Sequence, residues 1–369
     1  MTRMMNRMIV ADLRRRPTRS LVSIAAVAIE VILILMVVGL VQGMINDQRN
    51  RIQGVGADIL VRSGASSVLA QLSGNTLPLK MGEVFARVPG VQAVAPVAAM
   101  LGPSEMVIGG INPGQFDAVS GGFRFVQGHG FAPGSTEMIA DDLQAASQHY
   151  HLGEVIRMLG RNFTLVGIFE HGMGSRVYVP LDTLDALAGT PGRASVFYVK
   201  IAHGTDVHTV VQRLRALAPA EKIDSMRQYL SLFTASTISP AINVFQRVMI
   251  SIAVIIGFLV IFLSLYTTVQ ERTREVGILK ALGASRGYIV KGILRESELL
   301  AVLGVIAGVA IAYGLWRSFT HIFPTLSMEM TWQWVVLAAV IALVSSGVGA
   351  LYPAFKAAGQ DAIVALAYE

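Results

Sequence analysis

Residues 271–285 read ERTREVGILKALGAS and lie between two long apolar runs. Four charged residues come first, and three apolar residues then recur at intervals of three: Val276, Leu279 and Leu282. This spacing predicts a short helix with a narrow apolar stripe on an otherwise polar surface. Gly283 suits the end of that helix, and Ser285 suits the N-cap of the next one. We interpret the segment as an amphipathic docking helix at the end of a membrane bundle. An ordinary solvated loop between membrane helices is the alternative.

The run RTREVGILKALGAS resembles the cytoplasmic signature of the MacB/FtsX-like permeases of ATP-driven (ABC) transport systems. The closing YPAFKAAGQDAIVALAYE, residues 352–369, resembles that family's C-terminal tail. The likeness covers the membrane parts of nearly the whole chain, whereas the large middle segment is similar in layout only. It implies that residues 275–284 form a coupling helix seated in a groove of an ATPase subunit. The candidate contact residues are Glu275, Val276, Gly277, Leu279, Lys280, Leu282, Gly283 and Ala284.

Composition divides the chain between membrane and aqueous parts. With 53% apolar and 15% charged residues, the chain is too apolar for an ordinary soluble protein and too charged to be embedded throughout. Its Lys and Arg residues concentrate beside the apolar runs, where they act as topology signals, so the net charge of +6 does not indicate nucleic-acid binding. Cysteine is absent, which excludes disulfides, thiol catalysis and Cys-ligated metals.

Four apolar runs are long enough to cross a membrane as helices, at about 1.5 Å per residue. They lie at about 21–41, 248–269, 299–316 and 334–351, and Pro353 is predicted to end the fourth. The arginine-rich stretch before the first run could open a signal peptide. However, the run exceeds a signal core and lacks a small-x-small cleavage site, so we interpret it as a retained membrane helix.

Basic residues decide the predicted topology. The loop after the second run carries six Lys or Arg residues, whereas the loop between the third and fourth carries only Arg317. Because basic loops face the cytoplasm, we expect a multi-pass protein of the bacterial inner membrane with both termini cytoplasmic. The coupling segment then faces the cytoplasm, and residues 42–247 lie outside.

The sequence of the outer segment predicts mixed α and β structure. Strand signals at 57–61 and 197–201 accompany apolar helical faces at 81–88 and 207–217, which predicts two β-α-β units. An insertion at about 115–194 separates them, so we expect a ferredoxin-like layer with an inserted small β subdomain. This layout is like the extracytoplasmic domain of MacB-like permeases.

The predicted fold class is therefore an α-helical membrane protein with four transmembrane helices plus a large α+β extracytoplasmic domain. Three parts are expected. Residues 1–44 contain the cytoplasmic N-terminus and the first transmembrane helix, and residues 45–229 the MacB-like domain. Residues 230–369 contain the remaining helices, the coupling helix and the tail.

Catalytic chemistry is not indicated. No Gly-Lys dipeptide occurs, so the chain has no phosphate-binding P-loop; ATP and Mg²⁺ are expected at a partner ATPase, and no cofactor at this chain. His149 and His151 alternate and could both ligate a metal, but no third ligand accompanies them, so we interpret them as solvated and predict no metal site. Helix capping explains Asp141 and Asp142 at least as well as acid chemistry does.

Two features of the membrane runs point to close packing and a buried polar group. Gly304 with Gly308, and Ser345 with Gly349, have the small-x-x-x-small spacing that permits close helix approach, either within one bundle or at a dimer seam. Glu30 lies mid-span, where a charge costs about 3 kcal/mol or more. We expect it to be protonated and hydrogen-bonded to a neighbouring helix, with a haem-like or amphipathic ligand as the alternative. The family commonly has a small residue near this place.

The expected function is that of a permease subunit. It would couple ATP hydrolysis by a separate ATPase to movements of the outer domain, for export or extraction of a hydrophobic or amphipathic substrate such as a lipoprotein, lipid, drug, peptide or haem. A membrane-anchored sensor or regulator of a cell-wall hydrolase is the alternative. The expected partners are two copies of the ABC ATPase subunit, a second permease subunit (an identical or a sister chain) and membrane lipid. A periplasmic adaptor or acceptor is a further candidate, and nucleic acid is not expected.

Overall fold

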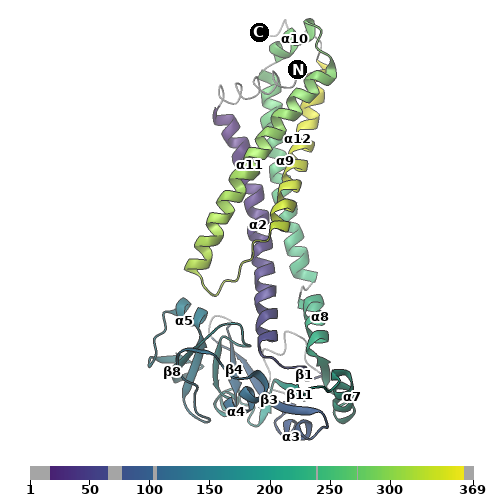
Figure 1. The fold of residues 1–369 in the computed structure, drawn as a ribbon. Coiled ribbons are helices and arrows are strands. Elements are labelled where there is room, and N and C mark those ends of the chain that lie inside the picture. Colours follow the sequence, from purple (N-terminus) through teal and green to yellow (C-terminus); the bar gives the residue numbers. More distant parts are fainter. Residues whose placement is uncertain (1–16, 65–76, 103–105, 238–239, 272, 361–369) are drawn as a thin grey trace. The chain divides into compact units, whose positions relative to one another are not determined.

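The computed structural model describes residues 17–64, 77–102, 106–237, 240–271 and 273–360 (Figure 1). The N-terminal arginines before residue 17 and the end of the tail, 361–369, lie outside the described residues. The chain divides into two compact units. The first comprises the residues up to 42, residues 241–319 and those from 328 onward, and the second comprises residues 43–240 and 320–327.

Long apolar helices make up the first unit. Within the described residues, four helices are long and apolar enough to cross a membrane. They are α2 (Pro17–Gly54), α9 (Pro240–Glu271), α11 (Arg286–Ile322) and α12 (Trp332–Gly359). Each is longer than the apolar run that predicted it, because polar residues at its ends continue the same helix. The last residues of α2, from 43 onward, belong to the second unit.

The prediction that Pro353 ends the fourth helix is wrong. Pro353 lies inside α12, which continues to Gly359. Proline removes one backbone hydrogen bond from a helix interior, but it does not prevent the following turn from forming where packing supports it. That support comes from buried alanines: Ala357 and Ala358 pack in one cluster with Val269 of α9 and Ile289 of α11.

Glycines allow the helices of the first unit to approach closely. A Cβ added at Gly304 would lie 2.6 Å from the Cβ of Val27, and one at Gly308 would lie 2.9 Å from the Ala28 carbonyl oxygen, both on α2. A Cβ at Gly349 would lie 3.0 Å from the Phe258 carbonyl oxygen on α9. These small residues therefore bring α11 against α2 and α12 against α9 of the same chain. Their use at a dimer seam stays a prediction.

A mixed β-sheet forms the centre of the second unit. Its ten strands run in the order β12-β1-β11-β3-β4-β9-β6-β8-β5, with β7 paired to β8, and a separate pair joins β10 to β2. The strands are β1 (Ile59–Arg62), β2 (Leu77–Pro78), β3 (Val91–Leu101), β4 (Val107–Ile111), β5 (Phe125–Gly128), β6 (Glu137–Asp141), β7 (Val155–Met158), β8 (Arg161–Phe169), β9 (Val177–Pro180), β10 (Arg193–Ala194), β11 (Val196–Ile201) and β12 (Lys222–Ser225). The helices are α3 (Lys80–Ala86), α4 (Pro113–Ser120), α5 (Asp142–Gln148), α6 (Leu181–Leu187), α7 (Val207–Leu217) and α8 (Met226–Thr237).

Alternation along the strands builds a core on each face of this sheet. In β1, Leu60 joins one cluster with Phe116 and Tyr178, whereas Ile59 and Val61 join another on the opposite face. This follows from the two-residue period of a strand, which sends successive side chains to opposite sides.

The predicted insertion at 115–194 shares this sheet with the rest of the domain. Its strands β5 to β9 continue the sheet through a parallel pair in which Ile108 of β4 faces Val177 of β9. They also share a core with β3 and β4, which includes Met138, Phe163 and Leu165. The insertion is therefore a second lobe built on one continuous sheet.

Candidate functional site

The predicted coupling segment forms the helix α10 (Thr273–Ala281), a tight turn and the start of α11. The turn is a Schellman motif: the Gly283 N–H donates to the Lys280 carbonyl and the Ala284 N–H donates to the Leu279 carbonyl, both at 2.9 Å. Gly283 has φ +92°, a conformation that favours glycine. Ser285 Oγ then accepts a hydrogen bond from the Tyr288 N–H at 3.2 Å and caps α11. The helix stop and the cap expected at these two positions are both present.

The apolar residues of α10 divide between two sides. Val276 packs against the cluster that holds Val269 and Ile289, and so faces the bundle. Gly277 is also buried and Leu279 is partly buried, whereas Leu282, in the turn directly after the helix, is 80% exposed. Ile278, which the three-residue spacing missed, is 45% exposed. Since Ile278 and Leu282 are four residues apart, they share one exposed face. The four-residue interval was the signal that could have identified Ile278.

Polar contacts hold the tail to α10. The Lys280 ammonium donates to the Gln360 carbonyl oxygen. The Gln360 amide in turn donates to Thr273 Oγ1 at 3.4 Å, and Thr273 Oγ1 donates to the Val269 carbonyl of α9 at 3.2 Å. Lys280 is therefore engaged with the tail, whereas Glu275 and Gly283 are exposed. We call the exposed side of α10, carried by Ile278 and Leu282, the coupling face.

Glu30 lies at the meeting point of α2, α9 and α12. It is 1% exposed, and Ser345 Oγ donates to its carboxyl group at 2.9 Å from Oε1. A Cβ added at Gly257 of α9 would lie 1.9 Å from Oε2, so the absence of a side chain there makes room for the carboxyl group. Glu30 thus faces an interface between helices. This is the arrangement expected of a buried carboxyl group hydrogen-bonded to a neighbouring helix.

Two further hydroxyl pairs join the membrane helices. The hydroxyls of Ser23 on α2 and Ser264 on α9 are 2.6 Å apart, and those of Ser297 on α11 and Ser346 on α12 are 2.9 Å apart. Such bonds satisfy polar groups that lipid cannot satisfy, and they fix which helices are neighbours.

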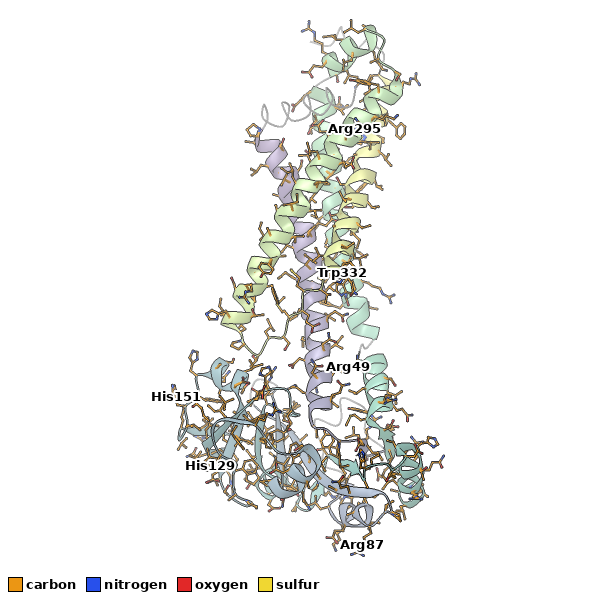
Figure 2. All side chains as sticks on the ribbon, viewed as in Figure 1. Arg49, Arg87, His129, His151, Arg295 and Trp332 are labelled. Atoms are coloured by element: carbon orange, nitrogen blue, oxygen red, sulfur yellow. The ribbon has the colours of Figure 1, made fainter. Side chains whose placement is uncertain are left out.

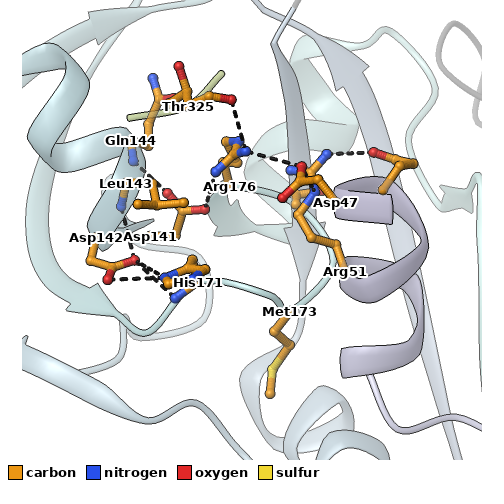
Figure 3. A network of polar contacts seen from close by, with 12 residues as sticks. Asp47, Arg51, Asp141, Asp142, Leu143, Gln144, His171, Met173, Arg176 and Thr325 are labelled. Carbon is orange, nitrogen blue, oxygen red and sulfur yellow. Dashed lines mark hydrogen bonds and ion pairs between the residues drawn. The ribbon is translucent and has the colours of Figure 1, made fainter. Parts of the chain in front are cut away.

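A buried ionic cluster, which we call the Arg176 junction, joins distant segments of the second unit (Figure 3). Arg176 directly precedes β9 and is 8% exposed. Its Nη1 donates to Asp141 Oδ2 and its Nη2 to Asp47 Oδ2, both at 3.1 Å. Nη2 also lies 3.3 Å from the Thr325 carbonyl oxygen, which it can reach as a second acceptor. Asp47 belongs to α2, Asp141 ends β6, and Thr325 belongs to the segment between α11 and α12.

Asp141 has two tasks in this junction. Its Oδ1 accepts a hydrogen bond from the Gln144 N–H at 2.6 Å, which caps α5 and confirms the capping role expected for Asp141. Burial raises the pKa of this carboxyl group, and the Arg176 guanidinium opposes that rise. The charge of Asp141 therefore depends on Arg176. No sequence motif could have identified Arg176, because its partners Asp47, Asp141 and Thr325 are remote from it in the chain.

The histidines of the second unit lie at its surface. His151, labelled in Figure 2, has an 85% exposed side chain whose Nδ1 is 3.9 Å from Glu154 Oε2. His171 Nδ1 lies 2.9 Å from Asp142 Oδ1. In the part of the chain that the structure describes, no three His, Asp or Glu residues gather in a way that could hold a metal ion.

These features define a class: a membrane permease whose helical bundle ends in a short amphipathic helix and whose first span continues into a large α/β domain. Comparison with known proteins agrees. Residues 20–217 match the MacB-like periplasmic core domain family, and residues 247–362 match the FtsX-like permease C-terminal family. The chain belongs to the MacB/FtsX-like family of ABC transporter permeases and is a multi-pass membrane protein, which confirms the resemblance noted in its motifs.

Similar proteins include permeases with and without a named substrate. YknZ of Bacillus subtilis (strain 168), an uncharacterized ABC transporter permease, is 28% identical over 231 residues, which are 59% of this chain and 57% of YknZ. The macrolide export ATP-binding/permease protein MacB of Bdellovibrio bacteriovorus is 29% identical over 244 residues, 59% of this chain and 36% of that protein. A structural match to the periplasmic region of MacB from Actinobacillus actinomycetemcomitans covers 50% of this chain and 95% of that structure. Its sequence identity is 16% and its TM-score is 0.39.

The chain thus spans less than two thirds of the length of these two curated relatives. Its own matches are to a periplasmic core domain family and a permease C-terminal family.

Proposed function

We propose that this chain transmits the motion of separate ATPase subunits to its MacB-like domain, and so drives export or extraction of a hydrophobic or amphipathic substrate. The observation that carries the proposal is the coupling face. It exposes two large apolar side chains, Ile278 on a short helix and Leu282 in the turn that follows it. Exposed apolar groups of this kind, set among charges, mark a protein contact.

The construction around α10 supports transmission of force. The helix is tied to α9 through Thr273, to the tail through Lys280 and to α11 through the tight turn at Gly283. A push on the coupling face would therefore move α9, α11 and α12 together, since packing at this end is close and hydrogen-bonded.

The Arg176 junction supports reception of that force in the MacB-like domain. The junction holds Asp47 of α2 and Thr325 of the segment between α11 and α12. Both segments are covalently continuous with membrane helices. Through Arg176 they bond directly to the ends of β9 and β6, so a shift in either segment would reach the sheet.

The assembly proposed around this chain has two ATPase subunits, which would use ATP and Mg²⁺, and a second permease subunit, identical or a sister chain. We place it in the bacterial inner membrane, among lipid, with both termini and the coupling face cytoplasmic; a periplasmic adaptor or acceptor is a candidate partner. The substrate class rests on relatives, one of which is named for macrolide export and another for pyoverdine export.

Charge on the coupling face tests the proposal. The double variant Ile278→Asp with Leu282→Asp should still reach the membrane, because neither side chain is buried. It should lose most ATPase subunit in a pull-down and most permease-stimulated ATP hydrolysis, because carboxylates would enter an apolar contact. Leu217→Asp is the matched control, since Leu217 is 55% exposed on α7 of the other unit.

Two outcomes would change the proposal. Wild-type recovery of the ATPase by the double variant would contradict docking through this face. The second outcome is that the double variant loses docking, but vesicles with the wild-type chain and a functional ATPase transport neither macrolide, lipid nor lipoprotein. The alternative function, a membrane-anchored sensor or regulator of a cell-wall hydrolase, would then be favoured over export.

A further inference from the structure

A partly enclosed cavity of about 120 Å³ lies inside the second unit, between the end of α2, the sheet and α8. Its volume exceeds the space of a single water several times over. Polar side chains from four elements line it: Gln48 and Arg51 of α2, Tyr178 of β9, Tyr198 of β11 and Tyr229 of α8. The coupling face has no residue in it, so the cavity is a separate feature of the molecule.

Arg51 brings a largely buried positive charge to this cavity. Its side chain is 16% exposed, and Nη2 donates to Gln48 Oε1 at 2.6 Å. Nε is buried and makes no hydrogen bond to the described residues, although Asp47 Oδ2 lies 3.4 Å away. Asp47 itself is engaged by Arg176 at 3.1 Å. Nε is therefore enclosed by protein atoms, and Arg51 lines the cavity through the rest of its side chain.

Tyr198 brings a second donor. Its hydroxyl has no hydrogen-bond partner among the described residues, whereas that of Tyr178 accepts from the Ser175 N–H at 2.8 Å and donates to the Met173 carbonyl at 3.2 Å. Burial raises the pKa of Tyr198, so the hydroxyl keeps its proton. The cavity wall therefore combines a cationic guanidinium group with a neutral hydroxyl donor.

We propose that this cavity binds a compact oxyanion, a phosphate or carboxylate group, through the Arg51 guanidinium and the Tyr198 hydroxyl. A guanidinium presents its N–H groups as a fork that matches two oxygens of such a group, and a hydroxyl donor completes the set. Apolar wall residues, among them Ile52, Leu60 and Val97, lower the local dielectric and strengthen these bonds. The group could be a free anion or the head of an anionic lipid, and the chemistry of recognition is the same.

Binding of inorganic phosphate and of acetate to the full chain in phosphatidylcholine nanodiscs tests the site, by calorimetry and by the unfolding midpoint. The wild type should bind at least one of them saturably. Tyr198→Phe should weaken that binding about tenfold or more, because one hydrogen bond to a charged group is lost. It should leave the anion-free midpoint unchanged, because the hydroxyl bonds to no described residue. Arg51→Gln should weaken binding further, and Arg49→Gln, at an exposed neighbour on α2, should not.

Nanodiscs of phosphatidylglycerol distinguish the two sources. If the site takes a lipid head group, phosphatidylglycerol should compete with phosphate. The apparent phosphate affinity of the wild type should then be lower in phosphatidylglycerol than in phosphatidylcholine, and that of Tyr198→Phe should be the same in both. If the ligand is a free anion, the two kinds of nanodisc should give equal affinities. Either result supports an oxyanion site. Absence of saturable binding in phosphatidylcholine, or equal affinities of the wild type and Tyr198→Phe, would overturn it. Retained ATPase pull-down by these variants shows that the site is independent of the coupling face.

Discussion

Replacing Arg176 by methionine removes the charge at the centre of the junction and keeps much of the side chain's length. Asp141, 1% exposed, and Asp47 would then lose the cation that binds both of them at 3.1 Å. Breaking a buried ion pair by removing one partner costs about 3–5 kcal/mol, because the remaining charge stays buried without compensation. We expect Arg176→Met to lower the free energy of unfolding of the MacB-like domain by an amount in this range.

Urea unfolding of the full chain in nanodiscs, followed by pulse proteolysis of the MacB-like domain, measures the loss. Arg124→Met is the matched control: Arg124 is 88% exposed and lies 3.9 Å from Glu170, so its replacement should cost less than about 1 kcal/mol. Adding Asp141→Asn to Arg176→Met should recover part of the stability, since the unpaired charge is removed. Equal costs for Arg176→Met and Arg124→Met would refute the reasoning.

The same variant has a pH signature. Burial already raises the pKa of Asp141, and without Arg176 it should rise further. A folded-state pKa above the unfolded value means that the folded domain takes up a proton first as the pH falls. Protonation then relieves the buried charge. The destabilisation by Arg176→Met should therefore be larger at about pH 8 than at about pH 5.

Three further predictions concern the bundle and the domain. Gly257→Ala should reduce the thermal stability of the purified bundle, at a cost of about 1–3 kcal/mol, because its Cβ would lie 1.9 Å from Glu30, whereas Gly314→Ala, with open space around it, should not. Glu30→Gln should retain assembly and transport and Glu30→Leu should lose assembly, as judged by size-exclusion chromatography and vesicle export; loss of transport by an intact Gln variant would instead assign a function to ionisation. Residues 45–229, the predicted MacB-like domain, should unfold in one cooperative thermal transition by circular dichroism when expressed alone, and an aggregating product would contradict those boundaries.

Local signals in the sequence were sufficient for the membrane helices and the turn after α10. Hydropathy identifies a span because every residue of an apolar run contributes to it, and Gly283 and Ser285 act through their own backbone and side chain. The ends of the spans were underestimated because helix formation continues past the last apolar residue. Pro353 shows the limit of a local rule, since the packing of Ala357 and Ala358 outweighs it.

Contacts between distant residues could not be predicted in this way. The pairing of Ile108 with Val177 depends on which strands meet, and alternation along a strand does not specify its neighbour. The same is true of Arg176, whose partners come from three remote segments. Spacing put Val276 on the predicted apolar stripe and the family resemblance made it a candidate contact residue, whereas its packing against α9 and α11 turns it inward.

The unbroken course of α2 has a mechanical consequence. Its 38 residues, at about 1.5 Å each, make a rod about 57 Å long. A tilt of about 5° at one end of such a rod displaces the other end by about 5 Å, roughly one helical turn. Asp47 and Arg51 lie near the C-terminal end of this rod, so if α2 pivots about its other end, the displacement is close to its largest at the Arg176 junction.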